Sequence, residues 1–564
     1  MLPLVRDERI TAWSQVDERS GAFFALGIAK ATGMVPVLAC TSGTAAANYA
    51  PAVHEAREAG VPLLVLTADR PPELREVGAG QVIDQIDLYG RAAKWFFEVG
   101  NHPATPERVR WMRALACRAV WTALDPRPGV VHLNFPLRDP LVPPSDVPDP
   151  PGGRAGGAPW LVRGLHPESP GGTGLELATM LRGRERGLIV VGRQEGPSPV
   201  AVAVERFASA IGWPVLSDPL GGGRCGANAV AHYDAILRSP SAALRPDFVL
   251  RIGDLPTSKP LRQWLASLAD VPQVAFDPPG VWHDPDNVLN AVLRGDPVTA
   301  LVALTLSTLG DEPPQPPFLA TDRLEPADPS WMRAWHSADA AAELSIEAIL
   351  RDELSEPRVA RELGATLPGD VTLVVASSMP VRDVESFWPV RREVPRVLSN
   401  RGANGIDGTV STALGVAATG RRTVLLIGDV ALLHDVGGLL AASRHGLALT
   451  IVLLDNDGGG IFEFLPISGE GDAYVDHVAT PHGRDFAHAA ALYDCDHVVP
   501  ATLADFLPPT AHEIVESHAQ RVACIPNRVE QADDGRGQRE GQRDGRAIVE
   551  RGAIGVGGQH PRHG

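Results

Sequence analysis

The sequence predicts an α/β protein built from three doubly wound parallel-sheet domains. Short apolar, β-rich runs alternate with helical patterns in three separate parts of the chain. A segment rich in proline and glycine, residues 141–157, follows the first part and has the composition of a domain linker. The 564 residues, 44% of them hydrophobic, suffice for roughly three domains. We therefore expect domains over residues 1–140, 158–335 and 336–515.

Composition excludes several classes of protein. The net charge of −17 argues against nucleic acid as a partner. No apolar run reaches the roughly 18 residues that a membrane span needs, and the first residues lack the pattern of a secretory signal. The five cysteines lie far apart without metal-ligand spacing, which predicts reduced thiols in a cytoplasmic protein. Residues 516–564 are rich in Gly, Arg and Gln and are expected to form a disordered tail.

The most informative stretch is residues 423–466, which reads as strand, turn, helix, strand and glycine-rich turn. Asp429 and Asn456 each follow one of the two strands. Because the carboxyl ends of neighbouring parallel strands meet at one edge of a sheet, these side chains are expected to face each other. Their oxygens and the carbonyl of Gly458 are ligands that Mg²⁺ accepts. An ordinary strand-turn-helix of a doubly wound sheet would show the same pattern.

The first domain places a second acid at a helix start. Glu18 precedes the helical pattern SGAFFALGIAKATG, where it is either functional or a first-turn acid that complements the helix dipole. The turn Thr41-Ser42-Gly43-Thr44 follows one predicted strand, and Asp69-Arg70 ends the next. Strand and helix alternate here as they do in the third domain.

Several strings in the chain resemble one enzyme family. DERSGAFFALGIAKATG, TSGTAAAN, LTADRPPELR and QVIDQIDLYG in the first domain and SNRGANGIDG in the third are similar to those of the 2-succinyl-5-enolpyruvyl-6-hydroxy-3-cyclohexene-1-carboxylate synthases. These enzymes use thiamine diphosphate (ThDP), and the Gly-Asp and Asn motif of residues 428–458 resembles the diphosphate and Mg²⁺ motif of ThDP enzymes generally. The chain departs from that motif at Val430 and Asp455. The resemblance covers most of the chain.

The resemblance implies ThDP and Mg²⁺, or Mn²⁺, as cofactors. Glu18 would be the catalytic glutamate that hydrogen-bonds N1′ of the aminopyrimidine, and Ile406 would prop the cofactor in its bent shape unless it is a plain core residue. The metal ligands would be Asp429, Asn456 and Gly458. The cofactor-binding residues would be Glu18, Thr41, Ile406, Gly428, Asp429, Asn456, Gly458, Ile461 and Phe462.

The resemblance also implies a set of residues that bind substrate carboxylates. Lys259 comes from the middle domain, where a solvated surface lysine is an equal alternative, and Pro260 stands where some members carry a second basic residue. The arginines of the third domain could instead form surface salt bridges. The expected substrate-binding residues are Arg70, Gln81, Lys259, Ser378, Arg382 and Arg401.

By the same resemblance the reaction would be a carboligation in menaquinone biosynthesis. The enzyme would decarboxylate 2-oxoglutarate and add the succinyl carbanion to isochorismate. A homodimer or homotetramer is expected, with Glu18 of one chain meeting Asp429 of another.

Two alternatives stay open. One is another ThDP enzyme, of the acetolactate synthase type. The other is a non-catalytic relic, because a Pro-Gly-Ser-Arg-Ser loop and the first strand of the family's first domain have no counterpart here.

Overall fold

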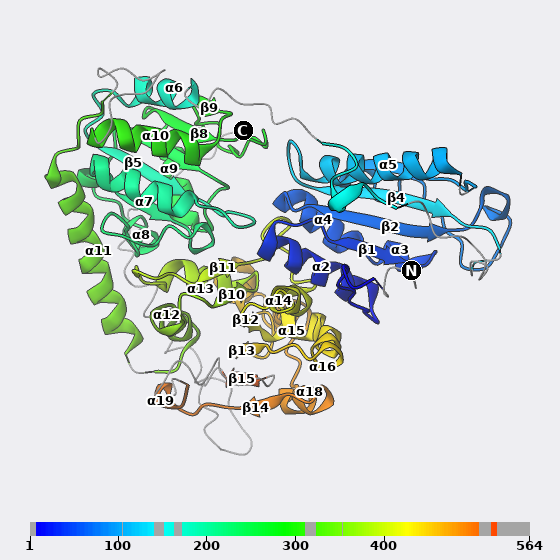
Figure 1. Cartoon of the computed structure of the whole chain (residues 1–564). Coiled ribbons are helices and arrows are strands. Elements are labelled where there is room, and N and C mark those ends of the chain that lie inside the picture. Colours follow the sequence, from blue (N-terminus) through cyan, green and yellow to red (C-terminus); the bar gives the residue numbers. More distant parts are fainter. Residues whose placement is uncertain are drawn as a thin grey trace, which may run out of the picture. The chain divides into compact units, whose positions relative to one another are not determined.

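The computed structural model describes residues 7–103, 105–139, 141, 152–162, 172–310, 323–351, 353–506 and 521–526. Its strands form three parallel sheets that follow one another along the chain (Figure 1). The α/β fold class and its three parallel-sheet domains are therefore confirmed. Within the described part of the chain, no helix is both long and apolar enough to span a membrane.

The sheet of the first domain has the strand order β1-β2-β4-β3. Alternate residues of β2 face opposite ways: Leu63 and Val65 pack with helices α2 and α4, whereas Leu64 packs with α5. Helices therefore cover both faces, which explains the continuous apolar strands. The strands are β1 (Val37–Cys40), β2 (Leu63–Asp69), β3 (Ala93–Glu98) and β4 (Val130–Pro136), and the helices are α2 (Glu18–Thr32), α3 (Thr44–Ala47), α4 (Ala50–Ala59) and α5 (Pro106–Leu124).

The middle domain has the strand order β6-β5-β7-β8-β9 around one continuous core. Helix α11 (Pro329–Leu350) runs across the boundary expected at residues 335 and 336, because Trp331 and Trp335 at its start pack into this core. The strands are β5 (Gly187–Val191), β6 (Val215–Ser217), β7 (Phe248–Ile252), β8 (Gln273–Phe276) and β9 (Ala291–Leu293). The helices are α6 (Gly172–Leu181), α7 (Val200–Ile211), α8 (Tyr233–Ile236), α9 (Lys259–Ser267) and α10 (Pro297–Leu309).

The third sheet has the order β11-β10-β12-β13-β15-β14. Its strands are β10 (Thr372–Val375), β11 (Arg396–Leu398), β12 (Thr423–Gly428), β13 (Thr450–Asp455), β14 (Asp496–Val498) and β15 (Arg521–Pro526). The helices are α12 (Glu356–Thr366), α13 (Met379–Phe387), α14 (Thr409–Ala417), α15 (Asp429–His434), α16 (Leu440–His445), α17 (Asp472–Tyr474), α18 (Phe486–Leu492) and α19 (Leu503–Phe506).

Strand β15 corrects the expected position of the tail. It pairs with β13 from Thr450↔Arg521 to Asp455↔Pro526, inside the segment expected to be disordered from residue 516. A run of six residues is too short to reveal by its pattern that it pairs between two strands far away in the sequence. The rest of the expected tail, residues 527–564, and most of the linker lie outside the described residues.

Helix α2 is shared between the cores of the first and third domains. Phe23 and Leu26 pack with the first sheet, whereas Phe24 and Ala31 pack with the core formed by α14 and the third sheet. The two helices cross at Gly27 of α2 and at Gly415 of α14. A Cβ on Gly27 would lie 2.1 Å from the carbonyl oxygen of Thr412, and one on Gly415 would lie 2.0 Å from that of Phe24. The backbones are therefore in direct contact.

This contact predicts that Gly415→Ala lowers stability. Helix propensity alone favours alanine over glycine by about 1 kcal/mol, but the added methyl group must push two backbones apart, which costs about 1–3 kcal/mol or more. We expect a lower midpoint of thermal unfolding by circular dichroism. Gly437→Ala is the matched control, because its added Cβ would meet no atom within 4 Å. Equal or greater stability of Gly415→Ala would contradict the close contact.

Candidate active site

The two motif strands of the third domain end side by side. Gly428 of β12 pairs with Leu454 of β13, so the residues that follow the two strands emerge at the same edge of the sheet. Asp429 is the first residue of α15, and Asn456 comes directly after β13. The structure therefore brings Asp429 and Asn456 together.

The Asp429 carboxylate is 2% exposed and fixed by three neighbours. One oxygen accepts the backbone N–H of Val430 at 2.7 Å. The other accepts the backbone N–H of Gly458 at 2.7 Å and lies 3.1 Å from Nε2 of His482. This acid is thus tied directly to the glycine turn after β13.

Asn456 is oriented by a carboxylate that the sequence did not reveal. Its Nδ2 donates to Oε1 of Glu356, the first residue of α12, at 3.0 Å. Its Oδ1 is buried and has no hydrogen-bond partner among the described residues. A buried acceptor without a donor is rare and costly in a native protein, so Asn456 Oδ1 has the surroundings expected of a metal ligand. Gly460 leaves room for this amide, because a Cβ there would lie 2.8 Å from Nδ2.

Gly458 occupies a conformation that only glycine adopts readily. Its φ is +138°, and an added Cβ would lie 2.3 Å from the carbonyl oxygen of Ala479. Its own carbonyl oxygen accepts the N–H of Gly460 at 3.0 Å and keeps a second lone pair. The donor set Asp429, Asn456 and Gly458 therefore fits a hard divalent cation.

Two further residues at this edge were missed by the sequence analysis. Ligand atoms of Asp429, Asp455 and His482 all lie within 4.8 Å of one another. Burial raises the pKa of Asp455, and the charge of Asp429 adds to that rise. Asp455 was noted only as a departure from the motif. His482 is far along the chain and follows no ligand spacing, so no pattern could have found it.

A pocket of about 160 Å³ opens over these groups. It combines the polar residues at the strand ends with apolar side chains from the turn after β13 and from the loop before α14. Glu356 also lines it. The predicted residues found here are Ser378, Ile406, Gly428, Asp429, Asn456, Gly458, Ile461 and Phe462. Ile406 also packs against the core of the third domain, so both roles considered for it are compatible with its position.

The predicted residues of the first domain gather at the carboxyl edge of a different sheet. Gln81 Nε2 donates to Thr41 Oγ1 at 3.1 Å, and Arg70 directly follows β2. Glu18 lies close to Cys40 at the end of β1: burial raises the pKa of Cys40 to about 11, and the charge of Glu18 contributes to that rise. None of these predicted residues is among the described residues that line the pocket of the third domain.

Glu18 is the acid in the first turn of α2, where it complements the helix dipole, but it is not the residue that caps the helix. The side chain of Asp17, not of Glu18, accepts the N–H groups of Arg19 and Ser20 at the start of α2. The Glu18 carboxylate makes no hydrogen bond or ion pair with any residue that the structure describes. It still lies in the first helical turn, but the helix end is already capped.

The predicted arginines form a basic cluster with a residue that was missed. Burial lowers the pKa of Arg401, and repulsion from Arg382 lowers it further. Burial also lowers the pKa of Arg382, with a contribution from the charge of Arg262 on α9. Lys259 is exposed at the first position of α9, three residues before Arg262. The i, i+3 spacing puts both residues on one side of α9. This spacing from Lys259 is the sequence pattern that could have pointed to Arg262.

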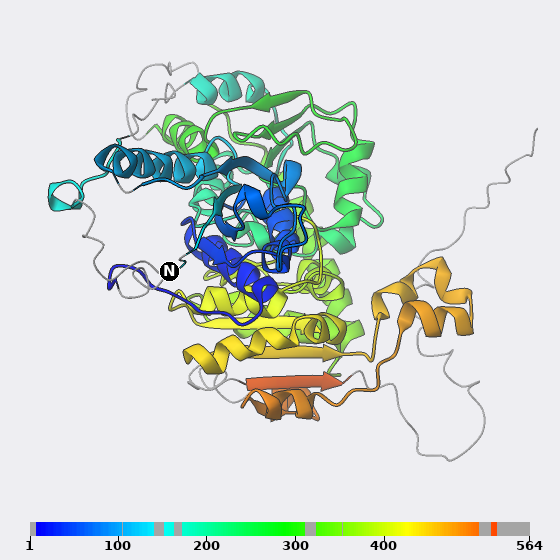
Figure 2. The same cartoon turned by 90° about the vertical axis from the view of Figure 1, so that its right-hand side faces the viewer.

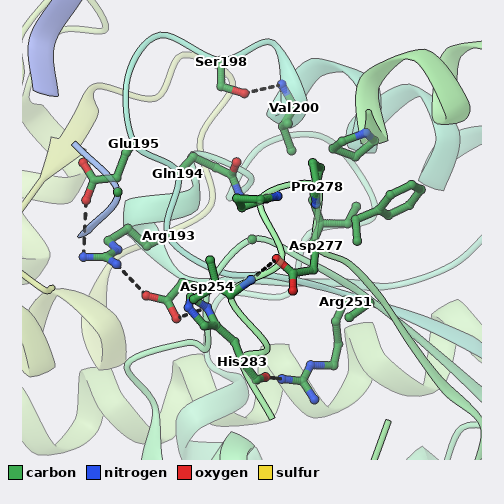
Figure 3. A pocket seen from close by; sticks show the side chains of 18 of the residues that line it. Arg193, Gln194, Glu195, Ser198, Val200, Arg251, Asp254, Asp277, Pro278 and His283 are labelled. Carbon is green, nitrogen blue, oxygen red and sulfur yellow. Dashed lines mark hydrogen bonds and ion pairs between the residues drawn. The ribbon is translucent and has the colours of Figure 1, made fainter. Parts of the chain in front are cut away.

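A larger pocket lies elsewhere, at the carboxyl ends of the middle-domain strands. It has a volume of about 480 Å³, and Arg193 in its wall pairs with Asp254 at 2.7 Å and with Glu195 at 3.3 Å (Figure 3). His283 approaches the same Asp254 at 2.7 Å. No residue predicted as part of the site lines this pocket. Four of its polar side chains, those of Arg193, Glu195, Asp254 and His283, are thus paired with one another.

Family models match all three domains. The model of the thiamine pyrophosphate enzyme N-terminal TPP-binding domain matches residues 1–88, where thiamine pyrophosphate (TPP) is another name for ThDP. The middle-domain model matches residues 176–273, and the C-terminal TPP-binding domain model matches residues 381–524. The last match extends into β15.

Curated relatives carry one common name, 2-succinyl-5-enolpyruvyl-6-hydroxy-3-cyclohexene-1-carboxylate synthase. The protein from Geobacillus kaustophilus is 43% identical over 507 residues, which is 88% of this chain and 84% of the relative. Those from Geobacillus thermodenitrificans and Chloroflexus aurantiacus are 41% and 40% identical, with 89% and 88% of this chain and 83% and 84% of the relatives covered. The chain therefore belongs to the family of thiamine diphosphate-dependent 2-succinyl-5-enolpyruvyl-6-hydroxy-3-cyclohexene-1-carboxylate synthases.

Proposed function

We propose that this protein joins 2-oxoglutarate and isochorismate, with loss of carbon dioxide, to form 2-succinyl-5-enolpyruvyl-6-hydroxy-3-cyclohexene-1-carboxylate in menaquinone biosynthesis. The observation that carries the proposal is the buried Oδ1 of Asn456 beside Asp429, which has no partner among the described residues. The basic cluster of Arg262, Arg382 and Arg401 supports acidic substrates.

Asp429, Asn456 and the Gly458 carbonyl would hold Mg²⁺ or Mn²⁺ and through it the diphosphate of ThDP. When bound, ThDP supplies a nucleophilic carbon for the 2-oxo group and accepts the electrons released by decarboxylation. Ile406, Ile461 and Phe462 line the same pocket and would keep water from the reacting carbon. Glu18 would hold a proton at N1′ of the aminopyrimidine. Its carboxylate is suited to this role because it has no hydrogen-bond partner among the described residues.

The substrate carboxylates would be bound by Arg382 and Arg401. Arg401 makes no hydrogen bond or ion pair with any residue in the described part of the chain, although it is mostly buried. A guanidinium held in that state is ready for a bidentate contact with a carboxylate. Ser378 would add a hydroxyl from the pocket over Asp429, which neither arginine lines. Arg70, Gln81 and Lys259 remain candidates for contacts from the other two domains.

The complete site would need two subunits in a homodimer, or in a homotetramer built from dimers. The residues proposed to bind the two ends of ThDP lie at the edges of two different sheets, and the pocket over Asp429 includes no described residue of the first domain. The segment after β13 stands out from the third sheet (Figure 2) and exposes Phe462, Phe464, Leu465 and Ile467, with Phe464 75% exposed. Such an apolar surface is typical of a subunit interface.

The function is tested by product formation. With ThDP and Mg²⁺, purified protein should consume isochorismate together with 2-oxoglutarate and release the succinylated product, identified by mass spectrometry. Pyruvate replaces 2-oxoglutarate in the control reaction, because an enzyme of the acetolactate synthase type would use it. Acetolactate formation, or no turnover of either 2-oxo acid, would contradict the proposal.

Glu18→Gln tests the role of the first-domain acid. The variant should bind ThDP and Mg²⁺ nearly as well as the wild type in a calorimetric titration, since Glu18 does not line the diphosphate pocket. Loss of a positioned proton-transfer group should slow deuterium exchange at the thiazolium C2, followed by NMR, by about 10²–10⁴-fold. Glu8→Gln, at an exposed position, is the matched control. Unchanged exchange in Glu18→Gln would remove Glu18 from the mechanism.

A complementation experiment tests the two-subunit site. Glu18→Gln and Asp429→Asn chains should each be inactive alone. When the two are co-expressed at equal levels, half of the dimers carry one chain of each kind, and one of their two sites is intact. Activity should then return to about a quarter of the wild-type value. If each chain instead formed its site by itself, co-expression would restore nothing.

A further inference from the structure

The loop that carries Arg401 is anchored from the first domain by a buried carboxylate. Glu55 of α4 accepts the backbone N–H of Gly402 on Oε1 at 2.9 Å and that of Ala403 on Oε2 at 2.7 Å. Its side chain is only 4% exposed. The two bonds fix two successive peptide groups directly after Arg401. Hydrogen bonds from N–H groups to a buried carboxylate are among the stronger ones in proteins.

A lysine completes this anchor. The Lys30 side chain is fully buried, and its Nζ donates to the carbonyl oxygen of Ser399 at 3.1 Å, on the other side of Arg401. The same Nζ lies 3.6 Å from Glu55 Oε1 and 2.9 Å from Oε1 of Glu195 in the middle domain. The backbone around Arg401 is therefore held on both sides by one buried ionic group. Glu195 extends this group to Arg193 in the wall of the larger pocket (Figure 3).

The close approach depends on a glycine. A Cβ on Gly402 would lie 2.6 Å from the carbonyl oxygen of Glu55 and 2.6 Å from the backbone nitrogen of Ala59, both in α4. Only a residue without a side chain lets the loop reach the Glu55 carboxylate. Gly402 and the Glu55 carboxylate are therefore both needed to hold the loop against α4.

We propose that Glu55 is a positioning residue, which sets where the Arg401 guanidinium meets a substrate carboxylate by holding the backbone of residues 402 and 403. The inference rests on the proposed function, because it takes Arg401 as a substrate-binding residue. Glu55 itself contacts no substrate. Three observations support it: the two-pronged hydrogen bonding, the absence of any described partner for the Arg401 side chain, and the glycine that permits the contact.

The test is a double-mutant cycle between Glu55→Gln and Arg401→Gln. Glutamine keeps one acceptor oxygen but turns an NH₂ group toward the other backbone N–H, so the loop should shift. We expect Glu55→Gln to raise KM for 2-oxoglutarate or for isochorismate about tenfold, equivalent to about 1.4 kcal/mol. In the Arg401→Gln background the same change should have little further effect, because the guanidinium that it positions is gone. Calorimetric binding of ThDP and Mg²⁺ should be unchanged.

Glu58→Gln is the matched control, because Glu58 lies on the same helix with a half-exposed side chain that pairs only with Arg57. It should leave KM at the wild-type value. If Glu55→Gln does not fold, Glu55→Asp takes its place, since it keeps the charge beside Lys30 but withdraws both oxygens from the loop. The inference is overturned if the Glu55 variant leaves KM unchanged, or raises it by the same factor with and without Arg401.

Failure of the proposed function gives a different result. In that case the wild type forms no product, and the cycle is run instead on the affinity for glutarate, a dicarboxylate without the reacting oxo group, measured by calorimetry. Coupled losses of glutarate affinity would support the positioning role independently of turnover. Additive losses, or no measurable glutarate binding by the wild type, would overturn it.

Discussion

The contact between α2 and α14 is the constraint on which the rest of the structure depends. With glycines at the crossing, the two helices meet backbone to backbone, and α2 can fill the cores of two domains at once. Both ends of α2 are then fixed to the third domain. At its start, Arg19 donates to the carbonyl oxygen of His434, and at its end Lys30 holds the Ser399 carbonyl. The first domain is thus oriented by a helix that also belongs to its neighbour.

A second pattern runs through the proposed site: a carboxylate fixes a group that is proposed to bind cofactor or substrate. Glu356 accepts from the amide of Asn456 and thereby fixes the orientation of this side chain. Glu55 accepts from the backbone beside Arg401. Asp429 accepts from the turn at Gly458. Each acid gives its partner a fixed hydrogen bond in place of water, so that the groups proposed to bind are oriented before any ligand arrives. Such preorganisation avoids reorganisation during the reaction.

The sequence could predict the candidate site residues that follow the strands, but few of the side chains that hold those residues in place. Asp429 and Asn456 were found because parallel strands bring their carboxyl ends to one edge whatever the remaining fold. The resemblance to a family contributed Ile406 and Ser378, whose surroundings have no local pattern. Glu356, His482 and Glu55 were missed because their partners lie 100, 53 and 347 residues away. Strand β15 was missed for the same reason, since its neighbours in the sheet decide its conformation.

The middle domain supports the proposed site, although none of its described residues lines the pocket over Asp429. Arg224 is 1% exposed and donates to the backbone carbonyls of Glu385 and Trp388, at the end of α13. Tyr233 donates to the Glu385 carboxylate, and burial raises the pKa of both side chains.

The opposite end of α13 carries Ser378 and Arg382. Removing Arg224 or Glu385 would leave a buried charge without its partner, which strongly destabilises a protein. Helix α13 is therefore clamped at its far end by the middle domain, just as the Arg401 loop is clamped by the first. The basic groups proposed to meet the substrate are therefore held in position by the first and the middle domain.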